Sequence, residues 1–424
     1  PNQPLFVLDG VIGVSATTIM DLDPGQVESI TLLKDAAATV IYGSEAANGV
    51  VVVETKLPEA GKLRFTYNGN YKLEMPDLSV YDLTDAKEKL QVEELAGYFS
   101  LQNDIDRMKY HAHLKEEILR GVNTYWLSKP LRTGFSHRHG IQFEGGDRAL
   151  RYKVYLGANF APGIMKETDL NTKTGKVDLL YRFKKFLISN QLSIDYSEGK
   201  RSSSYGSFKE YTYLNPYYRP YDDNGNIVKI LDQNDLLLGW YGTPTTNPLW
   251  NTMFGYKDET QNFIVREALR LEYTPIEALR LRLDFTLSRS DGKVEVFKSA
   301  QHTDFEGITD PSYKGSFDKT KSEGLDYRVS LTGSYNKAFG GEHLLSAFAQ
   351  YSITENSSNM EILSMKGFPN DRLDEVFLGT SFSNITGNEG ISRALGFVMT
   401  LNYSYKQRYA VDYSMRLDAS SQFG

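Results

Sequence analysis

Apolar and polar residues alternate along most of the chain after residue 61. In the segment 279–287, Leu and Phe occupy every second position, and Arg, Asp and Thr stand between them. The segments 325–332 and 395–405 repeat this two-residue period. Such a period predicts β-strands with one apolar face and one more polar face. A membrane barrel with lipid outside and water inside fits this pattern, and so does a soluble sandwich.

The connections between the strands distinguish these two architectures. We predict about eleven strands, at 62–74, 139–146, 150–160, 174–183, 186–197, 261–273, 279–290, 324–336, 342–355, 391–405 and 408–418. Short links such as Lys184-Lys185 alternate with long ones, which we place at 75–138, 161–173, 198–260, 291–323 and 356–390. Short periplasmic turns opposite long extracellular loops are typical of outer-membrane barrels, and a sandwich has no reason for this parity.

The first sixty residues have a different pattern, which predicts a small α/β module. Short apolar runs predict strands at Leu5–Leu8, Ser29–Leu33 and Val50–Thr55. Asp9-Gly10 and Asn48-Gly49 are turn signals that follow or precede two of these strands. On its own, the pattern does not show whether this α/β module is a small soluble domain or part of a larger protein.

Two short helices are predicted within this module. Asp23 and the proline after it can start the first helix, and Gln26 is placed to complete a capping box. Asp35 caps the second, an alanine-rich segment at 36–42 that Gly43 ends.

The opening segments resemble the second half of the plug domain of SusC/RagA-type, TonB-linked outer-membrane transporters. The resembling segments are PLFVLDG at 4–10, VESITLLKDAAATVIYG at 27–43 and ANGVVVVETK at 47–56. Segments further along, such as WLSKPLRTGFSHRHGIQFEGG at 126–146 and RYAVDYSMRLDASSQFG at 408–424, are similar to the front half of the barrel in the same family.

The resemblance implies an all-β transmembrane barrel with an α/β plug in its lumen. Plugged transporters have about 22 strands, so we expect this chain to hold half of such a barrel. We assign residues 1–60 to the C-terminal part of the plug and 61–424 to the N-terminal half of the barrel, with long extracellular loops. The remaining barrel strands and the segment that contacts TonB are expected elsewhere, the latter upstream.

The function that the resemblance implies is TonB-dependent import of a bulky nutrient across the outer membrane of a Gram-negative bacterium. The implied partners are a SusD-type surface lipoprotein, which acts as a lid, and TonB, with a dimer of transporter–lipoprotein pairs as the assembly. Oligosaccharide is the favoured substrate, and peptide is the next. The alternative is a passive pore or a surface-binding barrel without energy coupling. A barrel enzyme is disfavoured because we find no nucleophile and base in register, and we expect no cofactor.

Composition excludes several other classes of protein. No apolar run approaches the roughly 18 residues of a membrane helix. The absence of Cys removes thiol nucleophiles, zinc fingers and disulfides. The formal net charge of −7 argues against a nucleic-acid-binding protein.

Aromatic residues crowd one long loop, and some of them are candidates for substrate contact. They are Tyr213, Tyr217, Tyr218, Tyr221, Trp240 and Tyr241. Aromatic faces can stack on sugars, but the same residues can pack the loop on itself or form an interfacial girdle. We favour packing for most of this loop, which also holds Tyr211 and Trp250.

The plug segment supplies a second set of candidates, with structural and gating roles. They are Asp9, Gly10, Lys34, Asp35, Tyr42, Gly43, Asn48 and Gly49. Lys34-Asp35 could form a latch between plug and barrel, although a helix cap with a surface charge accounts for the pair more simply.

Two motifs that could hold a metal are weak. Asp222–Asn226 begins like a calcium loop but lacks the distal Glu, so a turn at Asn224-Gly225 accounts for it better. His137 and His139 supply two ligands without a third, and we expect His139 to start a strand in a solvated position.

Overall fold

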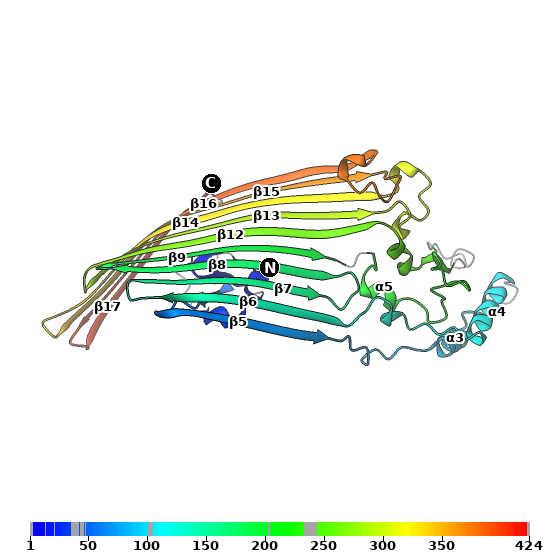
Figure 1. Cartoon of the computed structure of the whole chain (residues 1–424), viewed down its shortest axis with the longest axis horizontal. Coiled ribbons are helices and arrows are strands. Elements are labelled where there is room, and N and C mark those ends of the chain that lie inside the picture. Colours follow the sequence, from blue (N-terminus) through cyan, green and yellow to red (C-terminus); the bar gives the residue numbers. More distant parts are fainter. Residues whose placement is uncertain are drawn as a thin grey trace.

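The computed structural model describes residues 3–12, 14–20, 22–34, 42, 46, 48–100, 105–201, 204–232 and 244–421. Within these residues the strands form a four-stranded sheet, an 11-stranded sheet and a short two-stranded sheet. The 11-stranded sheet makes up most of the molecule, with the outer loops gathered at one end of its strands (Figure 1).

Each strand of the 11-stranded sheet pairs antiparallel with its neighbour in chain order. The strands are β5 Gly61–Glu74, β6 Gly134–Gly146, β7 Leu150–Pro162, β8 Asp169–Phe183, β9 Phe186–Lys200, β12 Tyr256–Ile276, β13 Leu279–Lys298, β14 Ser316–Phe339, β15 His343–Lys366, β16 Ser381–Tyr405 and β17 Tyr409–Ser420. The eleven predicted strands are therefore confirmed. Most extend several residues further toward the long loops than predicted, because backbone pairing continues after the apolar face ends.

One predicted long loop is wrong. The sequence predicts a long loop at 161–173, but β7 runs to Pro162 and β8 begins at Asp169. The register pairs Pro162 directly with Asp169, so the remaining residues form a tight connection. The segment 169–173 is mostly polar and lacks the apolar alternation by which the other strands were predicted.

The two faces of the sheet follow the sequence period. On β13, Leu281 and Leu283 are exposed on the outer face. Arg282 and Asp284 lie on the inner face, where their side chains form an ion pair at 2.7 Å. The apolar side chains therefore cover the outer surface, and charged and hydroxyl side chains line the inner one, as in a barrel with lipid outside. No described helix is long and apolar enough to cross a membrane.

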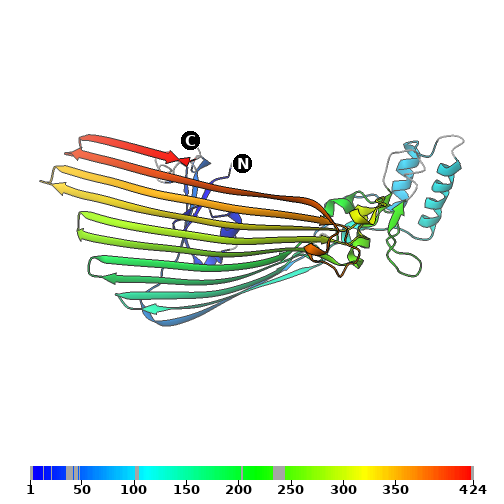
Figure 2. The same cartoon turned by 90° about the horizontal axis from the view of Figure 1, so that it is seen from above.

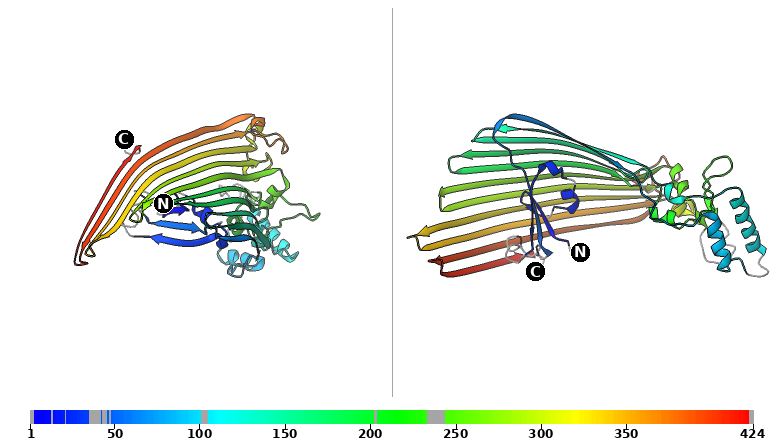
Figure 3. Two further views of the ribbon diagram at one scale, coloured as in Figure 1. Left: turned by 60° about the vertical axis from the view of Figure 1, so that its left-hand side comes forward. Right: turned by 90° about the horizontal axis from the view of Figure 1, so that it is seen from below.

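The four-stranded sheet has the order β2-β1-β4-β3. Its strands are β1 Leu5–Leu8, β2 Val11–Ile12, β3 Val27–Leu33 and β4 Val50–Thr55. β1 and β4 are parallel, and the other pairs are antiparallel. We call this sheet with its helices the plug. Figure 3 shows it on the concave side of the curved 11-stranded sheet.

The short helix predicted after Asp23 is a single 3-10 turn, and an unpredicted helix precedes it. Helix α1 is Ala16–Met20, and only the single 3-10 turn η1, Pro24–Gln26, follows Asp23. The Asp23 side chain accepts from the Gly25 N–H, but Gln26 does not complete a capping box, because its side chain reaches the barrel wall instead. The second predicted helix, at 36–42, lies almost entirely outside the described residues.

Two long loops fold together into one outer module at the end of the strands (Figure 2). Its helices are α3 Ala86–Leu95, α4 Ile105–Leu119 and α5 Phe208–Thr212, with the 3-10 turns η4 Trp126–Ser128 and η5 Pro248–Met253 and the strands β10 Ile230–Asp232 and β11 Thr245–Thr246. Its core joins Leu90 and Leu114 of the first loop to Tyr211 and Leu249 of the second. The β13–β14 loop holds η6 Thr303–Phe305 and η7 Pro311–Tyr313, and the β15–β16 loop holds η8 Val376–Leu378.

The assignment of faces predicts how arginine substitutions on one strand should differ. Leu283→Arg places a charge on the outer, lipid-facing surface and should destabilise the folded barrel by about 2–4 kcal/mol. Thr286→Arg on the same strand lines a cavity on the inner face, and should cost much less. Urea unfolding in detergent micelles or liposomes measures both. Equal losses for the two variants would contradict the assignment.

Candidate functional site

The Asp9-Gly10 turn joins the first two strands of the plug. Asp9 has a φ of 52° and Gly10 a φ of 90°, the left-handed region in which glycine is at ease. The Asp9 carboxylate accepts hydrogen bonds from the Thr55 N–H at 2.7 Å and the Thr55 hydroxyl at 2.9 Å. The turn is therefore fastened to the last residue of β4, which leads into the barrel. Burial raises the pKa of the Asp9 carboxyl above its ordinary value.

Plug and barrel wall meet along a seam of hydrogen bonds. Gln26 of the plug donates to Gln142 of β6 at 2.7 Å, and Tyr155 of β7 donates to Asp23 at 3.2 Å. Further bonds come from the wall to the plug: Arg138 to the Leu22 carbonyl at 3.4 Å, Gln191 to Thr55 at 3.4 Å and Arg266 to Thr18 at 3.3 Å. The seam therefore involves β6, β7, β9 and β12.

Lys153 of β7 forms the most deeply buried contact of the seam. Its side chain is 2% exposed and forms an ion pair at 2.8 Å with Asp178 of β8, which is 7% exposed. The same ammonium donates to the carbonyl of Lys56, just after the last plug strand. A buried charge is tolerated only when it is paired and hydrogen-bonded. Lys153 thus joins Lys56, where the chain leaves the plug, to the barrel strands β7 and β8.

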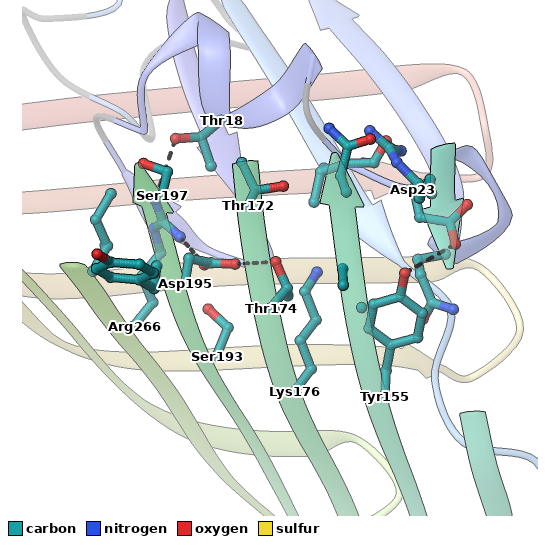
Figure 4. Close-up of a pocket in the computed structure, with 18 of the residues that line it drawn as sticks. Thr18, Asp23, Tyr155, Thr172, Thr174, Lys176, Ser193, Asp195, Ser197 and Arg266 are labelled. Atoms are coloured by element: carbon teal, nitrogen blue, oxygen red, sulfur yellow. Dashed lines mark hydrogen bonds and ion pairs between the residues drawn. The ribbon is translucent and has the colours of Figure 1, made fainter. Parts of the chain in front are cut away.

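A second charged group surrounds a small cavity of about 110 Å³ between plug and wall (Figure 4). Arg266 of β12 pairs with Asp195 of β9 at 2.7 Å, and Asp195 also accepts from Thr174 of β8 at 2.8 Å. Because Arg266 also reaches Thr18 of the plug, this network connects three wall strands to helix α1.

The plug also borders two larger cavities. One, of about 240 Å³, lies beside Asp9 and Gly10, and the second, of about 460 Å³, lies beside Val11. Both are also lined by Ile12 and Tyr42 of the plug and by inner-face residues of β13 and β14. The smaller cavity also borders β8, β9 and β12, which carry part of the seam, whereas the larger one is bordered by β13–β17.

The remaining plug candidates are only partly described. Gly49 has a φ of 88°, as the predicted Asn48-Gly49 turn requires, and its carbonyl accepts from the Leu5 N–H at 3.0 Å. Lys34 is exposed. Asp35 and Gly43 lie outside the described residues, so the Lys34-Asp35 latch stays a prediction.

Two of the predicted loop tyrosines lie in the core of the outer module. Tyr217 is 4% exposed and donates to the Glu93 carboxylate at 3.1 Å, and Tyr218 is 7% exposed and donates to Asp232 at 3.0 Å. Tyr110 donates to the same Asp232 oxygen at 2.6 Å. Burial raises the pKa of Tyr217. These hydroxyls join α3, α4 and β10, which is the packing role favoured for most of this loop, although spacing in the sequence did not indicate the partners.

The other loop aromatics differ in their surroundings. Tyr213 is 72% exposed, whereas Tyr221 is 40% exposed and lines an outer cavity of about 370 Å³. Tyr217 and Tyr218 also line this cavity, together with Glu117. Trp240 and Tyr241 lie outside the described residues. The structure thus brings three of the six candidates around one cavity.

The two weak metal motifs take part in ordinary turn and strand structure. Asp222 accepts from the N–H groups of Asn224 and Asn226, and Tyr221 forms a bridge with Ile227, which is the predicted turn. The predicted strand start at His139 is wrong, because β6 begins five residues earlier, at Gly134. His139 is partly exposed and contacts His137 at 3.1 Å. No group of three or more His, Asp or Glu side chains among the described residues could hold a metal ion.

The chain is similar to one known protein family and to several known sequences. Residues 1–50 match the TonB-dependent Receptor Plug Domain. The chain is 30% identical over 206 residues to the TonB-dependent receptor SusC of Bacteroides thetaiotaomicron, which covers 47% of this chain and 19% of that protein. It is 21% identical over 430 residues to the TonB-dependent receptor P39 of Formosa agariphila, which covers 100% of this chain and 38% of that protein.

Solved structures share the fold. The RagAB peptide importer in its open-open state matches with a TM-score of 0.80 at 22% identity, over 99% of this chain and 48% of that chain. The unliganded ferric citrate transporter FecA matches with a TM-score of 0.51 at 8% identity, over 98% of this chain and 50% of that chain. The chain thus spans about half the length of the solved structures that it matches, and less of the curated sequences.

A plug on the inner face of a long antiparallel sheet defines a class of protein, the plugged outer-membrane β-barrels. Within that class, the chain is similar to TonB-dependent receptors and transporters of the SusC/RagA type. The fold class expected from the sequence is confirmed, and the similarity to TonB-dependent receptors supports the expected family and outer-membrane location. The relatives named above are receptors and transporters.

Removing Lys153 should loosen the plug. Lys153→Ala leaves Asp178 buried without its cation and frees the Lys56 carbonyl, so it should cost about 3–5 kcal/mol of stability. Entry of a bulky antibiotic that the outer membrane normally excludes should increase. Lys184→Ala, at an exposed turn, is the control. The double variant Lys153→Met with Asp178→Leu leaves no unpaired buried charge, so it should regain stability while antibiotic entry stays increased.

Antibiotic entry that stays low in all three variants would contradict the anchoring role of Lys153.

Asp9 should make the stability of the plug depend on pH. Because burial raises its pKa above the ordinary 3.8, the folded plug binds this proton more tightly than the unfolded chain. The stabilising contribution is complete below about pH 3.8 and is lost as the pH rises through the raised pKa. Hydrogen exchange of β4, corrected for its intrinsic pH dependence, should therefore quicken across this window. Asp9→Asn should flatten the slope, while the exposed Asp82→Asn should keep it; an unchanged slope in Asp9→Asn contradicts the assignment.

Proposed function

We propose that the protein imports a bulky nutrient across the outer membrane with energy supplied through TonB. The observation that carries this proposal is the plug, which is hydrogen-bonded to the inner wall of the sheet by Gln26, Asp23 and Thr55. We assign residues 1–60 to the plug and 61–424 to half of the barrel. The match of residues 1–50 to the plug family supports the first assignment.

In this mechanism no covalent bond of the substrate changes. The plug closes the lumen at rest, and force transmitted by TonB, through a segment upstream of this chain, rearranges it. The seam resists this force through buried polar contacts, of which Lys153 with Asp178 is the most enclosed. The inner wall carries hydroxyl, amide and charged side chains, so a hydrophilic solute can exchange hydrogen bonds with it during passage.

The proposed partners are TonB and a surface lipoprotein of the SusD type. The outer module is the part of this chain that a lid would meet, because it lies at the outer end of the strands (Figure 2). Its buried core and the ties of Tyr217 to Glu93 and Tyr218 to Asp232 give such a partner a defined surface. We also propose a dimer of transporter–lipoprotein pairs, as the family resemblance implies.

Oligosaccharide is the proposed substrate, and peptide is the second candidate. The similarity to SusC and the tyrosine-lined outer cavity favour the first, because tyrosine rings stack on sugars and their hydroxyls form hydrogen bonds. The similarity to the RagAB peptide importer favours the second. We propose that the contacts come from Tyr213, Tyr217, Tyr218, Tyr221, Trp240 and Tyr241, with Tyr221 first because it is both exposed and at the cavity.

A passive pore or a surface-binding barrel without energy coupling is the alternative function. Neither needs a plug held inside the lumen by a dedicated seam, so the structure gives these alternatives less support. They differ from import in one measurable respect, since their uptake or binding does not require TonB.

Uptake measurements test the proposal. Cells that express the full-length protein should take up a labelled oligosaccharide only when TonB is present; uptake that persists without TonB would favour the pore. Labelled peptides, offered in parallel, decide between the two substrate classes.

Tyr221→Ala should raise the half-saturating concentration by roughly tenfold at most, since an aromatic contact contributes about 0.5–1.5 kcal/mol. The maximal rate should be retained. Tyr313→Ala, at an exposed tyrosine in the β13–β14 loop, is the matched control and should change neither value. Equal effects of the two substitutions would remove Tyr221 from the substrate site.

A further inference from the structure

The outer module contains a cavity of about 370 Å³ between helix α4 and the second long loop. Small-molecule sites in proteins usually have volumes of about 300–1,000 Å³, so this cavity is of a suitable size for a ligand. Its aromatic lining consists of Tyr110, Tyr217, Tyr218 and Tyr221. The first three rings are fixed by their hydroxyls, which donate to Asp232 or Glu93. The cavity therefore has an aromatic wall of defined shape.

Acidic side chains outnumber basic ones in the described lining of this cavity. The acidic residues are Glu117, Asp222, Asp223 and Asp232, and the basic ones are Arg219 and His113. Asp232 is buried, and two of the donors from which it accepts are the uncharged hydroxyls of Tyr110 and Tyr218. Residues 233–243, which follow it and lie outside the described residues, contain one Asp and no Lys or Arg. The cavity therefore carries an excess of negative charge.

Glu117 of α4 is a buried carboxylate that lacks part of its hydrogen bonding. It is 5% exposed, and its Oε1 accepts from Arg120 at 3.4 Å. Its Oε2 lies 3.4 Å from the Arg219 Nε and accepts a hydrogen bond from no described residue. Arg219 also pairs with Asp223, so its charge is shared between two carboxylates. A buried charge is costly unless it is paired and hydrogen-bonded, and a cation in the cavity would reduce this cost.

We infer that this cavity binds an ammonium group of the imported solute, and that the solute is an oligosaccharide containing amino sugars. Ring faces attract cations, carboxylates accept their N–H groups, and tyrosine rings also stack on sugars. A contact of this kind already exists at the cavity, because the Lys129 ammonium lies 6.0 Å from the centroid of the Tyr221 ring. The same lining repels solutes that carry carboxylate or sulfate groups. The inference rests on the proposed import function and adds the charge class of the substrate.

Equilibrium binding to the purified full-length protein tests the charge class. The probe is a short glucosamine oligomer, at a pH at which its amines are protonated. Its N-acetylated form, which has the same sugar rings without the charge, is the control. The charged oligomer should bind roughly tenfold more tightly at low salt, and high salt should remove most of this difference by screening. Equal affinity of the two forms, or tighter binding of the acetylated one, would overturn the inference.

Substitutions assign the charge preference to the cavity. Glu117→Gln removes a buried charge at constant shape and should weaken binding of the charged oligomer by about tenfold. Asp223→Asn, at an exposed side chain, should weaken it by about twofold because solvent screens this charge, and it keeps the test decisive if Glu117→Gln does not fold. Glu116→Gln, at an exposed neighbour on α4, is the matched control and should change nothing. An equal effect of all three, or none, would show that the cavity is not the site.

A short lysine-containing peptide and its acetylated form are measured in parallel. If only this pair shows the charge preference, the cavity binds the ammonium group of a peptide, and the assignment to an amino sugar is wrong. These binding measurements do not involve TonB. Uptake by the native protein that persists without TonB would overturn the proposed function and leave the charge preference standing, so the two failures are distinguishable.

Discussion

The pairing of backbone polar groups within the sheet is the constraint on which the rest of the structure depends. In hydrocarbon there is no water to satisfy an N–H or C=O, so each spanning strand must bond along its length to its neighbours. The register of β13 with β14 is continuous over 20 residue pairs, from Leu279 with Tyr335 to Lys298 with Ser316. That continuity fixes which side chains face lipid and which face the lumen, and so creates the inner wall on which the plug sits.

The plug uses this inner wall unevenly. Against β6–β12 it forms hydrogen bonds and depends on buried charges such as Lys153, whose removal from Asp178 would be costly. Beside Ile12 and Tyr42 it borders a cavity whose wall comes from β13–β17.

The two longest outer loops have a defined structure because they share a hydrophobic core. The two longest ones share a core in which Leu114 and Tyr211 come from different loops. Buried tyrosine hydroxyls at Tyr110 and Tyr218 converge on one carboxylate, that of Asp232. Such a core excludes water and gives the loop ends a fixed shape, which is what a site for substrate or for a partner protein requires.

Local chemistry in the sequence determined the strands, their faces and the turns at Asp9-Gly10 and Asn224-Gly225. A two-residue period and a left-handed turn are properties of neighbouring residues, so one chain reveals them. It could not reveal the shortness of the 163–168 connection or the partners of Tyr217, Tyr218 and Gln26. Those depend on contacts between segments far apart in the chain, such as Gln26 with Gln142 and Tyr217 with Glu93. Only the folded sheet brings them within bonding distance.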